Sequence, residues 1–126
     1  MGSETLHEKP EKMGEETVDQ HRAIVSLMEE LEAVDWYNQR VHATENAELR
    51  EILAHNRDEE MEHAAMVLEW LRRRIPKLDA HLKTYLNSEG SILAVEKAAE
   101  EGGGAGSGAG DGSLRIGSLR EGGGRQ

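Results

Sequence analysis

The chain contains no cysteine and no phenylalanine, and its 126 residues include only two tryptophans and two tyrosines. The absence of cysteine excludes disulfide bonds, thiol nucleophiles and thiolate metal sites, so oxygen and nitrogen ligands would have to hold any bound metal. Such ligands favour iron, manganese or zinc over iron–sulfur clusters. Because aromatic side chains are few and 32% of the residues are charged, a single copy buries only a thin core. We therefore expect the chain to associate with itself.

Positive charge and long apolar segments are also scarce. There are 15 Lys and Arg residues against 25 Asp and Glu, a formal net charge of −10. This balance argues against a nucleic-acid partner, since phosphate backbones require a positive surface. No apolar run approaches the ~20 residues needed to span a bilayer, and the first residues lack the hydrophobic stretch of a secretory signal. The sequence thus predicts a cytoplasmic protein with no nucleic-acid or membrane partner.

Two long stretches with helical periodicity occupy the middle of the chain. Apolar residues recur at intervals of three and four over residues 15–43 and again over 47–75, where Pro76 ends the pattern. The break at residues 44–46, Thr-Glu-Asn, offers a stop for the first helix and a cap for the second. Two long helices joined by so short a connection pack antiparallel. We therefore predict an all-α fold built on a helical hairpin.

The segments around this hairpin differ from it in composition. Residues 1–14 are polar, which predicts a flexible N-terminus. Two shorter helical patterns follow the hairpin, one ending before Gly90 and one over 92–101, so that the folded region is expected to cover residues 15–101. Eleven of the chain's 14 glycines fall after that point. Residues 102–126 are therefore predicted to be a flexible tether.

The second long helix carries an unusual pair, Glu60 and His63. Residues three apart on a helix project from the same face. On a wheel of about 100° per residue, both fall within about 35° of the centre of the apolar stripe. Burying an unpaired carboxylate there costs several kcal/mol, so the pair needs a cation, a hydrogen-bonding partner or solvent. The same Glu-x-x-His spacing is what each of two helices contributes to a carboxylate-bridged di-iron bundle.

One carboxylate of the first helix matches this pair. Glu30 borders the apolar stripe, whereas Glu29 and Glu32 point to the far side. Glu30 and Glu60 lie 15 residues on either side of position 45, and therefore at one level of an antiparallel hairpin, about 22 Å from the turn. One Glu and one Glu-x-x-His form half of the four-helix di-iron constellation. A two-fold dimer would supply the other half, and we then expect metal binding and dimerisation to be linked.

At this point the sequence resembles a known family. Residues 15–37 (EETVDQHRAIVSLMEELEAVDWY), the 55–63 stretch (HNRDEEMEH) and residues 68–72 (LEWLR) are similar to the encapsulated ferritins. These are half-length ferritin-like proteins carried inside encapsulin shells. The resemblance covers roughly residues 15–90 and the tail. It implies a ring-shaped decamer made from five dimers, in which the C-terminal helix helps to join neighbours.

The resemblance also implies roles for particular residues. It implies a ferroxidase centre between two subunits, in which Glu30, Glu60 and His63 are the catalytic metal ligands for iron. Trp36 and Tyr37 would line that centre. An acidic site that receives metal on its way in, where calcium or another divalent cation could also bind, falls on Glu29 and Glu32. Without the resemblance, Glu29 and Glu32 would be interpreted as a solvated acidic face. Trp36 and Tyr37 would then be interpreted as packing residues.

The tail repeats a short element, Gly-Ser-Leu-Arg, at residues 112–115 and 117–120. The encapsulin-targeting peptide of the family resembles the second copy with Ile116 ahead of it, which makes the encapsulin shell the expected partner. Three apolar side chains are spaced to enter small pockets as an extended peptide orders on the shell wall. The residues predicted to take part are Leu114, Ile116, Gly117, Ser118, Leu119 and Arg120.

The resulting prediction is a ferroxidase that oxidises Fe(II) to Fe(III) with O2 and delivers iron for storage inside an encapsulin nanocompartment. Two alternatives remain from the residues themselves. One is a non-catalytic helical adaptor whose acidic seam sets the register of a dimer, and the other is a zinc or manganese hydrolytic site. His55 and Glu59 are candidates for a supporting role at the metal site. The other histidines, His7, His21, His42 and His81, are expected at the surface.

Overall fold

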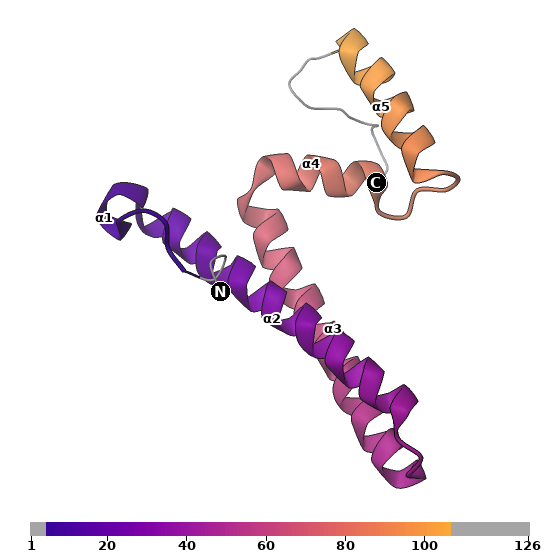
Figure 1. Cartoon of the computed structure of the whole chain (residues 1–126). Helices are drawn as coiled ribbons and strands as arrows, with labels where there is room; N and C mark the ends of the chain where they lie inside the picture. The colour runs from indigo at the N-terminus through magenta and orange to yellow at the C-terminus, as the bar shows by residue number, and fades with distance from the viewer. Residues whose placement is uncertain (1–4, 107–126) are drawn as a thin grey trace. The chain divides into compact units, whose positions relative to one another are not determined.

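The computed structural model describes residues 5–106 and contains only helices within that range (Figure 1). The predicted all-α fold is therefore confirmed. No helix in this part of the chain combines the length and apolar character needed to cross a membrane. The chain divides after Leu71 into two compact units. The helices are α1 (Pro10–Met13), α2 (Glu15–Ala43), α3 (Ala47–Arg74), α4 (Pro76–Tyr85) and α5 (Ile92–Gly106).

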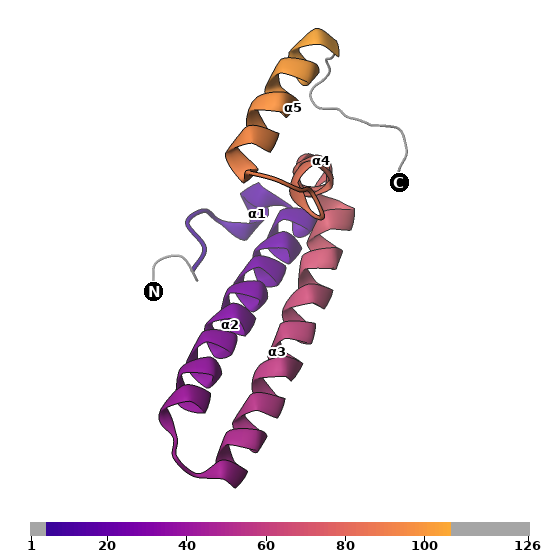
Figure 2. The same cartoon turned by 90° about the vertical axis from the view of Figure 1, so that its right-hand side faces the viewer.

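The first unit is a helical hairpin. Helices α2 and α3 run side by side in opposite directions (Figure 2), with 29 and 28 residues respectively. Gly14 precedes α2 with φ at 90°, a conformation that glycine adopts without steric cost. Two acidic residues in the first turn of α2 and two basic residues in its last turn complement the helix dipole. The predicted boundaries of both long helices are confirmed to within one residue.

The turn between these helices is closed by side chains. Asn46 Oδ1 accepts a hydrogen bond from the Leu49 N–H at 2.8 Å, which is the N-cap geometry predicted for α3. Thr44 Oγ1 accepts from the Asn46 N–H at 3.2 Å. Arg50 reaches back to the end of α2 and donates to the carbonyl oxygens of Thr44 (2.6 Å) and Val41 (3.4 Å). These bonds satisfy carbonyl groups that the end of a helix otherwise leaves without partners.

The core of the described chain is small. Four apolar residues are buried, Val18, Val41, Ala64 and Leu71, and no polar or charged residue among those described is. Several large apolar side chains on the hairpin are more than two-fifths exposed instead. A single copy thus leaves much apolar surface in water, as the composition predicted. The exposed set on α2 and α3 includes Ile24, Leu31, Trp36, Leu49, Ile52, Met61 and Met66.

The second unit contains the last turn of α3, α4 and α5. Pro76 is the first residue of α4, a position where its missing N–H costs nothing. The Asp79 carboxylate accepts a hydrogen bond from Arg72 and lies 3.1 Å from Lys83 Nζ. Despite partial burial, these two cations hold the pKa of Asp79 below its ordinary value. The Arg72–Asp79 pair fixes α4 to the end of α3, and the Lys83–Asp79 pair lies within α4.

Two chain segments differ from the sequence prediction. Residues 10–13 form the one-turn helix α1 within the stretch predicted to be flexible, and the Gly14 N–H bonds to the Pro10 carbonyl at 3.1 Å. Helix α5 continues to Gly106, whereas the prediction ended it at residue 101. The prediction ended the helix where the glycine-rich composition begins, at residue 102. Adding residues to an existing helix is far easier than starting one, and the ladder of hydrogen bonds runs on.

Candidate metal centre

Three of the predicted site residues converge on the hairpin. Glu30 comes from the middle of α2, and Glu60 and His63 come from α3. One ligand atom from each lies within 4.8 Å of the other two. His63 Nδ1 is 3.4 Å from Glu60 Oε1 and 3.8 Å from Glu30 Oε1. Two carboxylates and one imidazole at this spacing form a donor set suited to a first-row transition metal.

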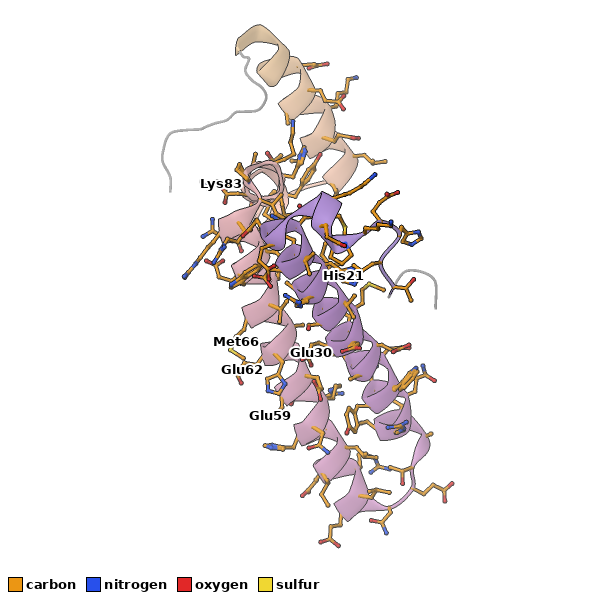
Figure 3. The ribbon with its side chains drawn as sticks, turned by 90° about the vertical axis from the view of Figure 1, so that its left-hand side faces the viewer. His21, Glu30, Glu59, Glu62, Met66 and Lys83 are labelled. Carbon is orange, nitrogen blue, oxygen red and sulfur yellow. The ribbon has the colours of Figure 1, made fainter. Side chains whose placement is uncertain are left out.

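The direction of helical side chains explains why these residues meet. In a helix the Cα–Cβ bonds tilt toward the N-terminus. Because α2 and α3 are antiparallel, Glu30 leans away from the turn and His63 leans toward it. The two side chains therefore approach each other, although His63 lies one turn beyond the level of Glu30 and Glu60. Figure 3 shows Glu30 on the side of α2 that faces α3.

The two carboxyl groups interact strongly when no metal is bound. A hydrogen bond between them raises the pKa of Glu30, and burial and the negative charge of Glu60 raise it further. The same hydrogen bond lowers the pKa of Glu60, which His63 lowers as well. The pair thus tends to share a proton, because two carboxylates this close disfavour being charged together. A divalent cation in this place would replace that proton.

The cluster is only partly shielded from solvent. The side chains of Glu30, Glu60 and His63 are 27%, 24% and 42% exposed. A closed structural metal site normally has all of its ligands from the protein, whereas open positions allow further ligands to bind. Three ligands on one side with access from the other fit an open site. They also fit a site that a second protein surface completes.

A further carboxylate lies beyond the imidazole. Glu59 Oε1 is 3.9 Å from His63 Nε2, on the nitrogen that does not face Glu30 and Glu60. The other Glu59 oxygen is 4.0 Å from His55 Nε2. Figure 3 labels Glu59 beside the cluster on α3. A carboxylate that hydrogen-bonds to a ligating histidine orients its ring, but these distances are longer than a hydrogen bond, and the supporting role of Glu59 and His55 stays a prediction.

The other predicted site residues lie outside the cluster in the single chain. Glu29 and Glu32 are exposed on α2, although the charge of Glu29 adds to the raised pKa of Glu30. The Trp36 side chain is 49% exposed. Tyr37 is half-buried, and the Arg40 guanidinium lies 5.5 Å from its ring centroid. The predicted targeting residues 114–120 lie outside the described residues.

The sequence reasoning missed one contact across the hairpin. Arg57 Nη1 on α3 donates a hydrogen bond to Asn38 Oδ1 on α2 at 2.9 Å. The two residues lie 7 and 12 positions from residue 45, so the rule that equidistant residues face each other does not pair them. The length of the arginine and the tilt of helical side chains would have indicated the contact.

A helical hairpin that presents one Glu from one helix and Glu-x-x-His from the other is half of a ferritin-like carboxylate bundle. This defines the class of protein. A family model described as EncFtn-like matches residues 5–89. The chain belongs to this family.

Individual relatives agree with the family. The "Encapsulated ferritin-like protein" of Rhodospirillum rubrum is 60% identical over 125 residues, which cover 94% of this chain and 89% of the relative. The "Encapsulin nanocompartment cargo protein EncC" of Myxococcus xanthus is 36% identical over 84 residues, 62% of this chain and 65% of the relative. A crystal structure of a protein from Nitrosomonas europaea matches with 59% identity and a TM-score of 0.67, over 69% of this chain and 96% of that one.

Proposed function

We propose that this protein oxidises Fe(II) to Fe(III) with O2 and is carried as cargo inside an encapsulin shell. The observation that carries the proposal is the convergence of Glu30, Glu60 and His63, whose ligand atoms lie within 4.8 Å of one another. Membership of a ferritin-like family supports iron as the metal. Iron is here the substrate, which arrives as Fe(II) and leaves as Fe(III) for storage.

The donor set suits this change of oxidation state. Hard anionic oxygens favour the higher charge of Fe(III), while an imidazole retains affinity for Fe(II). In this proposal Glu30 and Glu60 bind or bridge the two irons, and His63 caps one of them. Each Fe(II) gives up one electron, and O2 is the electron acceptor. Any proton held between Glu30 and Glu60 must leave before both carboxylates can bind iron.

A second copy of the chain would complete the site. One hairpin provides one Glu and one Glu-x-x-His, and a di-iron bundle needs two of each. The thin core and the exposed apolar side chains of α2 and α3 support burial of this surface against another hairpin. A two-fold axis beside the cluster would bring two half-sites together. The annular decamer that the family resemblance implies would be built from such dimers.

Other predicted residues have places in this proposal. Trp36 and Tyr37 would line the completed centre from the neighbouring hairpin or their own. Glu29 and Glu32 would receive metal ions on the outer side of α2, where calcium or another divalent cation could also bind. The tail residues 114–120 would dock on the shell wall. The encapsulin-related names of the relatives support this partner and a location inside the nanocompartment.

Anaerobic titration with Fe(II), followed by addition of O2, tests the proposal. The wild-type protein should bind Fe(II) in a fixed ratio and show a rapid oxidation transient in stopped-flow absorbance. Glu60→Ala and His63→Ala should abolish the rapid phase, because each removes a ligand from an already incomplete set. Glu51→Ala is the matched control, since it removes an exposed glutamate of the same helix.

The outcomes separate the proposal from the adaptor alternative. A helical adaptor would show neither stoichiometric Fe(II) binding nor an oxidation transient in the wild-type protein. Unchanged initial rates in Glu60→Ala or His63→Ala would contradict the assignment of the site.

A further inference from the structure

The hydrogen bond between Asn38 and Arg57 joins the two helices that supply the candidate metal ligands. Arg57 Nη1 donates to Asn38 Oδ1 at 2.9 Å, and 19 residues separate the two in sequence. The Arg57 side chain is 21% exposed and its Nε also donates to Asp58 Oδ1 at 3.1 Å, whereas Asn38 is exposed. A charged donor makes a stronger bond than a neutral one. The contact therefore links α2 to α3 at a defined point.

The geometry of the hairpin directs these side chains toward each other. On α3 the N-terminal direction runs toward the turn, and on α2 it runs away from the turn. Arg57 therefore leans toward the turn and Asn38 leans away from it. Their positions differ by about 7.5 Å along the hairpin at 1.5 Å per residue, a gap that the long arginine side chain spans. The same opposed tilt brings Glu30 to His63.

The metal site depends on how α2 and α3 are aligned along their length. Glu60 and His63 share one helix, so their spacing is fixed by the helix itself. Glu30 comes alone from α2, and its distance to them changes with any sliding of one helix past the other. Metal–oxygen bonds are about 2.0–2.2 Å long, so a slide of an ångström or two would break the ligand set. With little buried apolar contact, directional polar contacts have more influence on this alignment.

The pKa shifts of the two carboxyl groups are accounted for by groups other than Arg57. The groups that shift the pKa of Glu30 are Glu60, His63 and Glu29, together with burial. The groups that shift the pKa of Glu60 are Glu30 and His63, again together with burial. Arg57 is one turn from Glu60 in sequence, but its guanidinium points toward Asn38. Its influence on the cluster is therefore geometric.

We propose that the Asn38–Arg57 hydrogen bond is a positioning contact that holds Glu30 in register with Glu60 and His63. This inference rests on the proposed function, because it concerns the alignment of the same metal ligands. Neither residue touches the metal in this arrangement. The contact sets the separation and axial alignment of α2 and α3 one to two turns below the ligands, on the side toward the turn.

Titration of the full-length protein with Co(II), followed by visible absorption, tests the inference without relying on iron oxidation. Asn38→Ala removes the acceptor and leaves the backbone carbonyl that contacts His42 unchanged. Metal affinity should fall by roughly 2-fold to 10-fold, the loss expected from removing one solvent-accessible hydrogen bond that aligns the ligands. Asn38→Asp restores an acceptor for Arg57 and should restore affinity and the Co(II) spectrum.

Gln39→Ala is the matched control. It removes an exposed side-chain amide from the adjacent position of α2, where Gln39 bonds only to Asp35 of the same helix among the hydrogen bonds resolved for its side chain. Gln39→Ala should bind Co(II) like the wild type. The helical circular dichroism signal and the melting temperature should be similar in Asn38→Ala, Asn38→Asp and Gln39→Ala. A loss of affinity in Asn38→Ala then reports misaligned ligands and not a loss of folding.

Several results would overturn the inference. One is equal Co(II) affinity in Asn38→Ala and Gln39→Ala, and another is a folded Asn38→Asp protein that binds as weakly as Asn38→Ala. If Asn38→Ala loses helical structure, its low affinity is uninformative, and the affinity of the folded Asn38→Asp protein becomes the test. If the wild type binds Co(II) and oxidises Fe(II), and the variants bind Co(II) with the same affinity, only the positioning role is refuted. A wild type that neither binds Co(II) nor oxidises Fe(II) removes the proposed function as well.

Discussion

At the scale of single residues, the hydrogen-bonded carboxyl groups of Glu30 and Glu60 govern how the candidate site responds to pH. The raised pKa of Glu30 means that its contribution to stability is present at low pH and is lost as pH rises through that pKa. The lowered pKa of Glu60 acts in the opposite sense, because its contribution is lost as pH falls through that pKa. The two effects partly cancel in the stability of the metal-free chain.

Metal binding should show a clearer pH dependence than stability. Metal ions compete with protons for Glu30, and because its pKa is raised this competition begins at a higher pH than for an ordinary glutamate, so Co(II) affinity should fall as pH is lowered toward that pKa. In weakly buffered solution, binding should release protons, and Glu30→Gln should reduce this release together with the affinity. Calorimetric titrations in buffers of different ionisation enthalpy measure both quantities. Binding without proton release near that pKa would contradict the prediction.

The residues of the candidate site could be predicted from the sequence because helical geometry is regular. The three-residue spacing of Glu60 and His63 and the equal distance of Glu30 and Glu60 from the turn depend only on the period and rise of a helix. The Asn38–Arg57 contact was missed because it depends on side-chain length and tilt. The proposed placement of Trp36 and Tyr37 beside a completed site depends on a neighbouring surface, so helical geometry alone could not give it.

At the scale of elements, the hairpin turn was the most predictable feature. Residues 44–46 interrupt the apolar periodicity, and Asn46 has the side chain that a helix N-terminus prefers. The first and last helices were harder to predict, because α1 and the last turn of α5 depend on backbone hydrogen bonds more than on apolar patterning. The glycine-rich composition after residue 101 gave too early an end for α5.

Removing the cap should weaken the hairpin measurably. Asn46→Ala deletes the acceptor for the Leu49 N–H and should lower the free energy of unfolding by about 1 kcal/mol. Urea denaturation at one fixed protein concentration measures the change, since association adds to apparent stability. Glu45→Ala alters an exposed neighbour in the same turn and serves as the control. Equal midpoints for the two variants would show that the cap contributes nothing.

At the scale of the whole molecule, the exposed apolar surface of α2 and α3 points to association. The composition predicted that a single copy buries little, and the exposed apolar side chains on α2 and α3 confirm it. The identity of the surface that covers them could not be predicted from periodicity, because one chain does not specify its neighbour's position. The family resemblance, carried by residues 15–37 and 55–63, is what suggested a second copy and an encapsulin shell as the partners.

The tail should control packaging and leave chemistry unchanged. Deleting residues 112–120 removes both Gly-Ser-Leu-Arg copies and no residue of the candidate metal centre. The shortened protein should oxidise Fe(II) at the wild-type rate but should no longer co-purify with encapsulin when the two are expressed together. A deletion of equal length within the preceding glycine-rich segment is the control. Co-purification equal to that of the wild type would refute the targeting role.

The three candidate ligands all lie before Leu71, in the first of the two units, and α4 and α5 contribute none of them. A substitution after Leu71 therefore removes none of the three candidate metal ligands. More than two-fifths of the chain, residues 72–126, could therefore change to suit a new shell or a new neighbour without altering the three ligands, whereas α2 and α3 could not.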